Sequence, residues 1–264
     1  MSTADGQSTT GPPGRLLATG NVAEVFEWGQ RVLKLYKSPA AKPVVFREAA
    51  IHAAVEAFAL PVPSVWGVQQ VGSRWGIVFD RVCGFSFAQR MRSAPEKTSY
   101  YLQYMARLHM AIHRQVAVRF GGLKVRLASR IAETNDLDEA RRQNLLEGLA
   151  AMPDGDRLCH GDFHPMNILG DTDKPLVIDW PDACCGDPAA DVCRSYVLLA
   201  LHARDLATPY LDVYHRIGGI SRATALAWLP YVAAAKLAEK VPGETIGLRE
   251  ILYSSGRTEV LSRG

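Results

Sequence analysis

The sequence has no long apolar run, no strong excess of charge and no cluster of basic residues. Its longest uncharged apolar stretch, Ala223 to Ala235, contains Pro230 and is too short to cross a membrane. The chain has 30 Lys and Arg against 27 Asp and Glu, and its only adjacent basic pair is Arg141 and Arg142. It therefore lacks the basic surface that nucleic-acid binding requires. We expect neither a membrane nor a nucleic acid as a partner.

Cysteine is scarce as well. The five cysteines are odd in number, which argues against a disulfide framework and favours a reducing, cytoplasmic compartment. No Cys-x-x-Cys pair is present, so a zinc site is disfavoured. Residues 1–14 are polar and rich in Gly and Pro, with no basic start and no apolar segment. They predict a disordered lead-in and not a secretory signal.

The remainder of the chain has enough apolar material for a real core, with 48% hydrophobic residues over 264 positions. Short β-rich runs separated by turn residues fill residues 15–80 and indicate an antiparallel sheet. One helix interrupts them over residues 44–60, with Pro43 in its first turn and Pro61 beyond its end. The expected strands are 15–18, 24–28, 31–36, 64–68 and 75–79.

Beyond residue 84 the apolar spacing becomes helical. Leu102, Met105, Leu108, His109 and Ile112 follow this spacing, and further helical segments are expected over 192–203, 206–217, 222–240 and 248–253. The predicted fold class is α+β, with two lobes. The expected divisions are a lead-in (1–14), a small β-rich lobe with one helix (15–80), a short connector (81–84) and a larger, mostly helical lobe (85–264).

The strongest functional pattern is His-Gly-Asp-Phe-His-Pro-Met-Asn over residues 160–167, followed by Asp179. An Asp, an Asn and a second Asp in this order suit metal-assisted phosphoryl transfer. Such chemistry needs one carboxylate that accepts the proton of an attacking hydroxyl, and an amide and a second carboxylate that hold Mg²⁺ against nucleotide phosphates. A lone Asp or Asn would simply be a common loop residue, but the combination of three favours this chemistry.

This loop resembles the catalytic loop His-Gly-Asp-x-His-x-x-Asn of the aminoglycoside phosphotransferase and choline kinase family. The resemblance extends over nearly the whole chain from about Arg15, although it is sharply diagnostic only from His160 to Asp191. It implies a protein-kinase-like fold, with a nucleotide-binding lobe (15–80), a hinge (81–84) and a catalytic and substrate-binding lobe (85–264). It also implies ATP or GTP as phosphate donor and Mg²⁺ as cofactor. It also implies that Asp162 is the catalytic base and that Asn167 and Asp179 are the metal ligands.

Two residues of the first lobe support this interpretation. Lys34 shares one face of its strand with Val32 and Tyr36, because side chains alternate along a strand. Glu48 lies on an expected apolar helix face with Val44, Ile51 and Val55. A carboxylate there requires a partner. Lys34 is the expected one, and such a pair would hold the lysine for the α- and β-phosphates. A plain surface pair is the alternative.

The rest of the nucleotide site is less marked, since no Gly-x-Gly-x-x-Gly or Gly-x-x-x-x-Gly-Lys-Ser/Thr loop is present. Gly20 and Asn21 resemble the glycine-poor phosphate turn of the family, whose backbone N–H groups can meet phosphates. Asp80 and Val82 stand where the family offers backbone groups to the base. The apolar residues expected around the base are Val25, Val32, Leu169 and Ile178.

Several polar residues near the loop are expected to be structural. His160 is predicted to brace the loop by hydrogen bonds, and His109 to be a hydrogen-bonded core residue, whereas His164 could approach a phosphate. Asp187 before Pro188 has the form of a helix N-cap. Asp191, one turn later, is predicted to tie that helix to the loop.

The leading hypothesis is transfer of the nucleotide γ-phosphate to a hydroxyl of a small molecule. A metal-dependent phosphoesterase and a non-catalytic nucleotide-binding module are the alternatives. Residues beyond 84 carry 22 basic and 21 acidic groups, whereas polycationic aminoglycosides need a carboxylate-lined site. We therefore expect a weakly charged acceptor, such as a macrolide, a nucleoside antibiotic or a sugar derivative, with aminoglycosides as the alternative.

Overall fold

The computed structural model describes residues 11–170 and 173–252, which form two compact units. The first unit comprises residues up to 84 together with 169–181, and the second comprises 85–168 and residues from 182 onward. Most of the predicted lead-in lies outside the described residues, but Gly14 is included and donates its N–H to the carbonyl of Glu27 (3.0 Å). Segment 169–181, which the sequence assigns to the second lobe, joins the first unit. There the N–H of Val177 donates to the carbonyl of Pro61 (2.8 Å).

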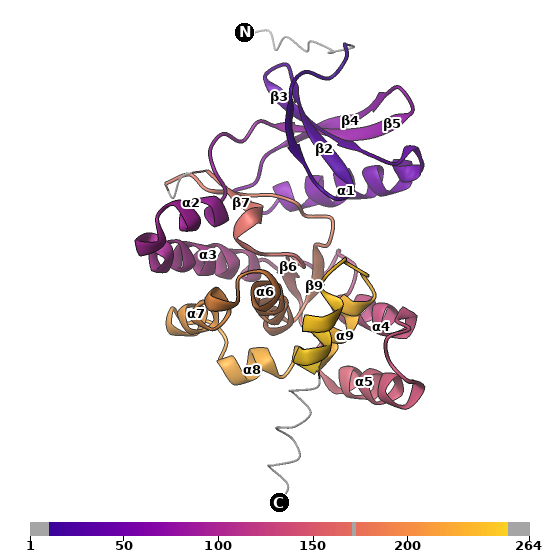
Figure 1. The fold of residues 1–264 in the computed structure, drawn as a ribbon, viewed down its shortest axis with the longest axis vertical. Coiled ribbons are helices and arrows are strands. Elements are labelled where there is room, and N and C mark those ends of the chain that lie inside the picture. Colours follow the sequence, from indigo (N-terminus) through magenta and orange to yellow (C-terminus); the bar gives the residue numbers. More distant parts are fainter. Residues whose placement is uncertain (1–10, 171–172, 253–264) are drawn as a thin grey trace, which may run out of the picture. The chain divides into compact units, whose positions relative to one another are not determined.

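An antiparallel sheet with strand order β1-β2-β3-β5-β4 forms the body of the first unit (Figure 1). The turn residues expected between the first three strands lie between them, and Gly29 has the positive φ (61°) that a tight turn favours. The two faces of the sheet carry separate apolar clusters, one around Ile77 and one around Leu33. The strands are β1 (Leu16–Thr19), β2 (Ala23–Trp28), β3 (Arg31–Tyr36), β4 (Val65–Val71) and β5 (Arg74–Asp80).

Helix α1 (Lys42–Glu56) packs against β4 and β5, with Pro43 in its first turn as expected. Its buried residues are Val45, Glu48, His52 and Val55. The expected stripe is therefore displaced at its start, because Val44 is half exposed and Val45 is buried in its place. The helix also ends at Glu56 instead of residue 60, and Ala59 follows with a positive φ of 52°, which is incompatible with a continued helix.

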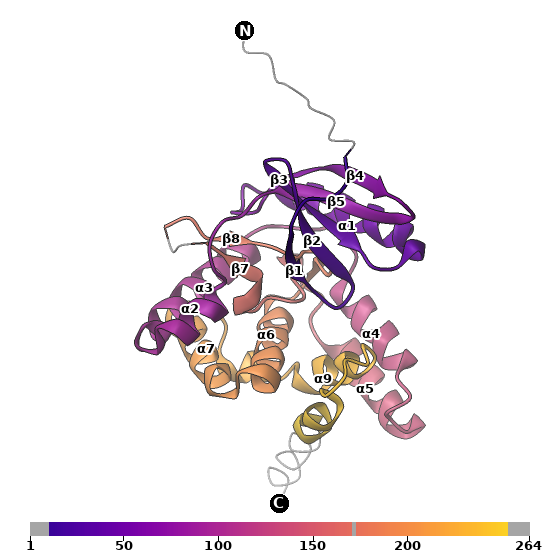
Figure 2. The same cartoon turned by 45° about the horizontal axis from the view of Figure 1, so that its top comes forward.

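The second unit is mainly helical. Helix α3 packs against α7, and α4 packs against both α5 and α9 (Figure 2). The segment expected as one helix over 222–240 is instead divided into α8 and α9, and Pro230 occupies the first turn of α9, where its missing N–H costs nothing. The helices are α2 (Phe87–Ser93), α3 (Thr98–His113), α4 (Leu123–Glu133), α5 (Glu139–Ala151), α6 (Pro188–His202), α7 (Arg204–Arg216), α8 (Arg222–Leu226) and α9 (Leu229–Leu237).

Residues 245–252 are also helical, in agreement with the helix predicted from residue 248, whose last residue, Tyr253, lies outside the described range. No helix within the described ranges is long and apolar enough to span a membrane. Together the sheet and the helices confirm the predicted α+β class.

Two short strand pairs flank the predicted catalytic loop. Strand β6 (Arg157–Cys159) pairs antiparallel with β9 (Cys184–Gly186). The catalytic loop begins directly after β6, so this pairing anchors the start of the loop. Strands β7 (Ile168–Leu169) and β8 (Leu176–Val177) form a second two-stranded sheet after the loop. Asp187 caps α6, since its side chain accepts the N–H of Ala189, which confirms the predicted N-cap.

Candidate active site

The first unit contains a cation held between two carboxylates. Lys34 of β3 donates from Nζ to Glu48 of α1 (2.8 Å) and to Asp179 (2.7 Å). The expected ion pair between Lys34 and Glu48 is therefore present. Burial alone would lower the pKa of Lys34, but the charges of Asp179 and Glu48 outweigh it and raise this pKa above its usual value. The amine accordingly stays charged.

Asp179 has an unusual backbone. Its φ is 66°, in the left-handed region that residues other than glycine seldom adopt, and such strain concentrates at functional sites. The next residue, Trp180, is fully buried and donates from its indole N–H to the carbonyl of Val177 (3.0 Å), which anchors the turn. The side chain of Asp179 is 39% exposed, so a carboxylate held in place by Lys34 remains accessible from solvent.

The other residues of the first unit predicted to bind the nucleotide lie on several separate elements. Gly20 and Asn21 lie in the turn between β1 and β2, and Gly20 accepts a hydrogen bond from Nζ of Lys37 (2.7 Å). The side chain of Asp80 accepts hydrogen bonds from Ser64 N–H and Trp66 Nε1, so it organises the start of β4. Val25 lies opposite Lys34 in the ladder of β2 and β3. The partly buried candidates are Val25, Val32, Val82, Leu169 and Ile178.

The second unit brings Asp162 and Asn167 together. Asn167 donates from Nδ2 to the backbone carbonyl of Asp162 (2.9 Å) and to its Oδ2 (3.3 Å), and only 7% of Asn167 is exposed. His164 lies 3.3 Å from the same carboxylate. Burial would raise the pKa of Asp162, but the hydrogen bond from His164 and the charge of Arg194 lower it below its usual range. Asp162 is therefore ionised, and its side chain is 30% exposed.

Arg194 also belongs to this site, although it lies outside the catalytic motif of the sequence. Its Nε donates to the carbonyl of Gly161 (3.2 Å), and a terminal nitrogen lies 3.7 Å from Asp162. The same nitrogen donates to both oxygens of Glu239 (2.7 and 3.0 Å). Its position three residues after Asp191 on a predicted helix places it beside that residue, and this spacing was the available sequence signal.

The loop backbone is held from α6. Asp191 accepts the N–H groups of His160 (2.6 Å) and Gly161 (2.8 Å), which confirms the predicted tie between helix and loop. Ring Nδ1 of His160 accepts the N–H of Asp162 (3.2 Å), so His160 braces the loop as expected. Gly161 has a φ of 81°, and a Cβ there would lie 2.5 Å from the carbonyl oxygen of Asp182. Only glycine fits this position.

The donor atoms suit a hard divalent cation. With Nδ2 of Asn167 engaged by Asp162, its Oδ1 is the atom that could bind a metal ion. Asp179 presents an accessible carboxylate. Amide and carboxylate oxygens are the ligands that Mg²⁺ prefers. The two residues predicted as metal ligands therefore fit Mg²⁺ in their chemistry.

A family model described as "Phosphotransferase enzyme family" matches residues 22–228, most of the chain. The chain belongs to this phosphotransferase family. The phosphotransferase is accordingly an enzyme that transfers a phosphoryl group to an alcohol group of a small molecule, which confirms the family resemblance and the predicted enzyme class. This membership favours phosphotransfer over the phosphoesterase and over the non-catalytic module.

Solved structures show the same fold. The phosphotransferase is similar to a thermostable mutant of aminoglycoside phosphotransferase APH(4)-Ia in ternary complex with ADP and hygromycin B (18% identity, 94% of this chain and 92% of that chain, TM-score 0.64). It is also similar to APH(2")-IIa in ternary complex with streptomycin and ATP (17%, 96% and 97%, TM-score 0.59). A choline/ethanolamine kinase family protein from Mesorhizobium loti is a third similar structure (19%, 98% and 90%, TM-score 0.57).

These similarities show a kinase-like fold for the phosphotransferase, as the resemblance implied. No curated protein sequence matches the chain.

Proposed function

We propose that this phosphotransferase moves the γ-phosphate of ATP or GTP to a hydroxyl group of a weakly charged small molecule. The observation that carries the reaction is the ionised, partly exposed carboxylate of Asp162, fixed by Asn167 and His164 on a loop that Asp191 holds rigid. An ionised carboxylate accepts a hydrogen bond from an alcohol and so orients the attacking oxygen.

In this proposal Asp162 takes the proton of the acceptor hydroxyl as the new O–P bond forms and the bond to the nucleotide diphosphate breaks. Lys34, held charged by Glu48, binds the α- and β-phosphates. Asn167 and Asp179 would hold Mg²⁺, which supplies charge neutralisation for the phosphates when bound. Gly20 and Asn21 cover the phosphates, Asp80 and Val82 supply backbone groups to the base, and apolar side chains flank it. Those side chains are Val25, Val32, Leu169 and Ile178.

The state of the acidic residues next to the catalytic loop supports this acceptor class. Asp182 pairs with Arg126 and Arg130, and Glu239 pairs with Arg130 and Arg194. These carboxylates are already neutralised by arginines of the same unit. A polycationic acceptor would have to displace them, whereas a macrolide, a nucleoside antibiotic or a sugar derivative would not. Aminoglycoside phosphorylation is the alternative.

Phosphate transfer tests the reaction directly. Wild-type protein is incubated with Mg²⁺ and γ-labelled ATP or GTP, and labelled product is measured over a panel of neutral hydroxylated compounds and aminoglycosides. Because positioned proton transfer contributes on the order of 10²- to 10⁴-fold to a rate, Asp162→Ala should lower kcat by that amount. Asp154→Asn, which removes an 88% exposed carboxylate of the same unit, is the control and should leave transfer unchanged.

Full transfer by Asp162→Ala would overturn the proposed role of Asp162. Efficient turnover of kanamycin-like compounds at low micromolar concentration would overturn the proposed acceptor class and leave the reaction intact. Release of phosphate from esters with Mn²⁺ and no nucleotide would favour a phosphoesterase instead.

A further inference from the structure

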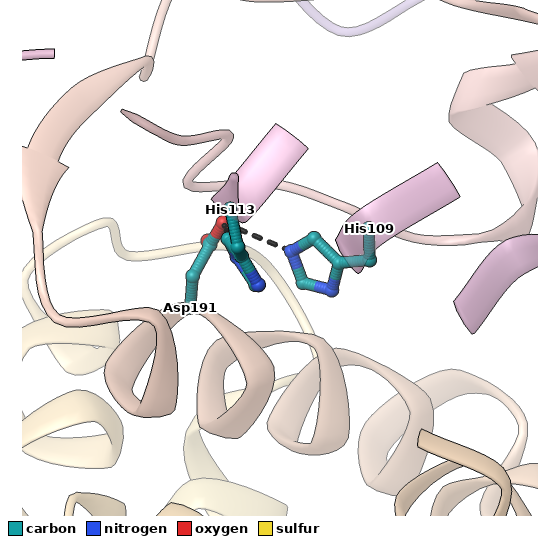
Figure 3. Close-up of side chains that lie close together, drawn as sticks. All are labelled: His109, His113 and Asp191. Atoms are coloured by element: carbon teal, nitrogen blue, oxygen red, sulfur yellow. Dashed lines mark hydrogen bonds and ion pairs between the residues drawn. The ribbon is translucent and has the colours of Figure 1, made fainter. Parts of the chain in front are cut away.

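A buried polar cluster joins α3 to α6 beside the catalytic loop. Figure 3 shows its centre, where His109 and His113 of α3 approach Asp191 of α6. Both imidazole Nε2 atoms lie within hydrogen-bond distance of Oδ2 of Asp191, at 2.9 Å for His109 and 3.2 Å for His113. Together with the N–H groups of His160 and Gly161, four donors surround one carboxylate that is fully buried.

Two tyrosines of α7 fix the protonation of these rings. The hydroxyl of Tyr210 lies 2.5 Å from Nδ1 of His109, and the hydroxyl of Tyr214 lies 2.7 Å from Nδ1 of His113. Burial raises the pKa of both phenols, so each remains a donor. Each Nδ1 therefore accepts, and each Nε2 carries the proton that it donates to Asp191. Burial also lowers the pKa of His109 to about 3, which keeps its ring neutral.

His109 has a second contact with the loop. Its ring stacks on Phe163, with centroids 4.1 Å apart and planes inclined by 23°. Phe163 is fully buried and directly follows Asp162. His109 thus acts on the chain before Asp162, through Asp191, and on the chain after it, through Phe163.

We propose that His109 is a positioning residue for phosphoryl transfer, whose ring holds Asp191 and Phe163 and so fixes the backbone that carries Asp162. His113 contributes a second donor to the same carboxylate. This inference rests on the proposed function, because it assigns to Asp162 the group that must be aimed. A misplacement of about 1 Å at a reacting group can lower a rate on the order of 10²-fold, so rigid support here has a catalytic consequence.

Three variants test this role. His109→Leu removes the donor, His109→Gln retains one, and Leu102→Ala removes a buried side chain of the same helix that has no polar group. We expect kcat to fall roughly 10- to 100-fold in His109→Leu, with KM values for nucleotide and acceptor changed less than about 3-fold, and to recover substantially in His109→Gln. A loss of kcat in His109→Leu no larger than in Leu102→Ala would overturn the proposal.

Amide hydrogen exchange provides a test that does not require turnover. The N–H groups of His160 and Gly161 donate to Asp191. Their exchange, measured by two-dimensional NMR, should accelerate at least about 10-fold in His109→Leu and much less in Leu102→Ala. Unchanged protection in His109→Leu would overturn the positioning role even in an active enzyme. Absence of any transfer by the wild type would instead refute the proposed function, while the exchange result would still decide whether His109 holds the loop.

The side chains of His109, His113 and Asp191 also offer ligand atoms that lie within 4.8 Å of one another, as a transition-metal site would require. Direct hydrogen bonds already satisfy Asp191, so the cluster needs no ion. Elemental analysis of the purified protein distinguishes the two interpretations. We expect no stoichiometric metal, whereas one zinc or iron per chain that is lost in His109→Gln would overturn the proposal.

Discussion

Each unit of this phosphotransferase holds one aspartate in a network of polar contacts, but the two networks are built in opposite ways. Asp191 of the second unit is fully buried and receives four hydrogen bonds, from two imidazoles and two backbone N–H groups. Asp179 of the first unit is 39% exposed, is paired with the cation Lys34 and has a positive φ of 66°. The carboxylate of Asp191 is thus enclosed by protein, whereas that of Asp179 is held by the charge of Lys34 and remains accessible to solvent.

This difference in exposure distinguishes a structural role for Asp191 from a ligand-binding role for Asp179. A buried carboxylate surrounded by hydrogen-bond donors can only organise its surroundings, and Asp191 organises the loop of residues 160–167. An accessible carboxylate held in a strained conformation is available for a ligand, and the strain must be offset by the surrounding fold. We therefore expect substitutions at Asp191 to act mainly on stability and substitutions at Asp179 to act mainly on activity.

The largest effect should come from Asp191→Ala, which leaves four buried N–H groups without their acceptor. Each such group costs about 1–3 kcal/mol, so the free energy of unfolding should fall by at least about 4 kcal/mol. Urea unfolding monitored by circular dichroism measures this loss. The matched control is Asp182→Ala in the same unit. That side chain is 29% exposed and pairs with arginines that can reach water, so its loss should cost only about 0.2–1 kcal/mol. Equal losses in the two variants would erase the distinction.

The reverse pattern is expected for Asp179→Asn. Asparagine tolerates the left-handed backbone, and Lys34 keeps Glu48 as a partner, so stability should change by less than about 1 kcal/mol. If Asp179 binds Mg²⁺ as proposed, loss of its charge should nevertheless lower kcat/KM on the order of 10²-fold or more. Nucleotide transfer assays and urea unfolding on the same preparation check both halves. A stable but fully active variant would show that Asp179 is not a ligand, and an unfolded one would show that it is structural.

Those parts of the two networks that depend on local sequence patterns can be predicted from the sequence. Alternation along β3 and helical spacing in α1 predict the pair of Lys34 and Glu48. The N-cap at Asp187 and Pro188 indicates where α6 begins, and Asp191, one turn later, contacts the loop. His109 was expected to be a hydrogen-bonded core residue for the same reason, since its place on an apolar helix face requires a polar partner.

Other features depended on contacts that no local pattern records. Arg194 binds Glu239 across 45 residues, so neither residue shows its partner in the sequence. The apolar face of α1 begins at Val45 instead of Val44. Which of these two neighbours is buried depends on how the helix packs on the sheet. Helix α4, by contrast, did carry an unused signal in Leu123, Leu127 and Ile131, which follow one another at intervals of four and are all buried.

The smallest expected effect is a difference in pH dependence between the two clusters. His109 stays neutral when folded, with its pKa lowered to about 3 by burial, whereas the unfolded chain takes up a proton near its ordinary value of 6.5. The unfolded state therefore binds more protons below pH 6.5, and stability falls with acidification by up to about 1.4 kcal/mol per pH unit. The raised pKa of Lys34 has the opposite consequence, because its contribution is complete below pH 10.5 and is lost only at higher pH.

Urea midpoints at pH 7.5, 6.5, 5.5 and 4.5 measure the acid side of this difference. His109→Gln should show a shallower decline than the wild type, because glutamine takes up no proton in the unfolded state. His215→Gln, which removes an exposed histidine of the same unit, should keep the wild-type slope. His52 of the first unit is also buried and also has a pKa lowered by burial, so His52→Gln should remove part of the slope independently. If the slope is the same in His109→Gln and in the wild type, the ring is not held neutral, and the contrast between a neutral and a charged cluster fails.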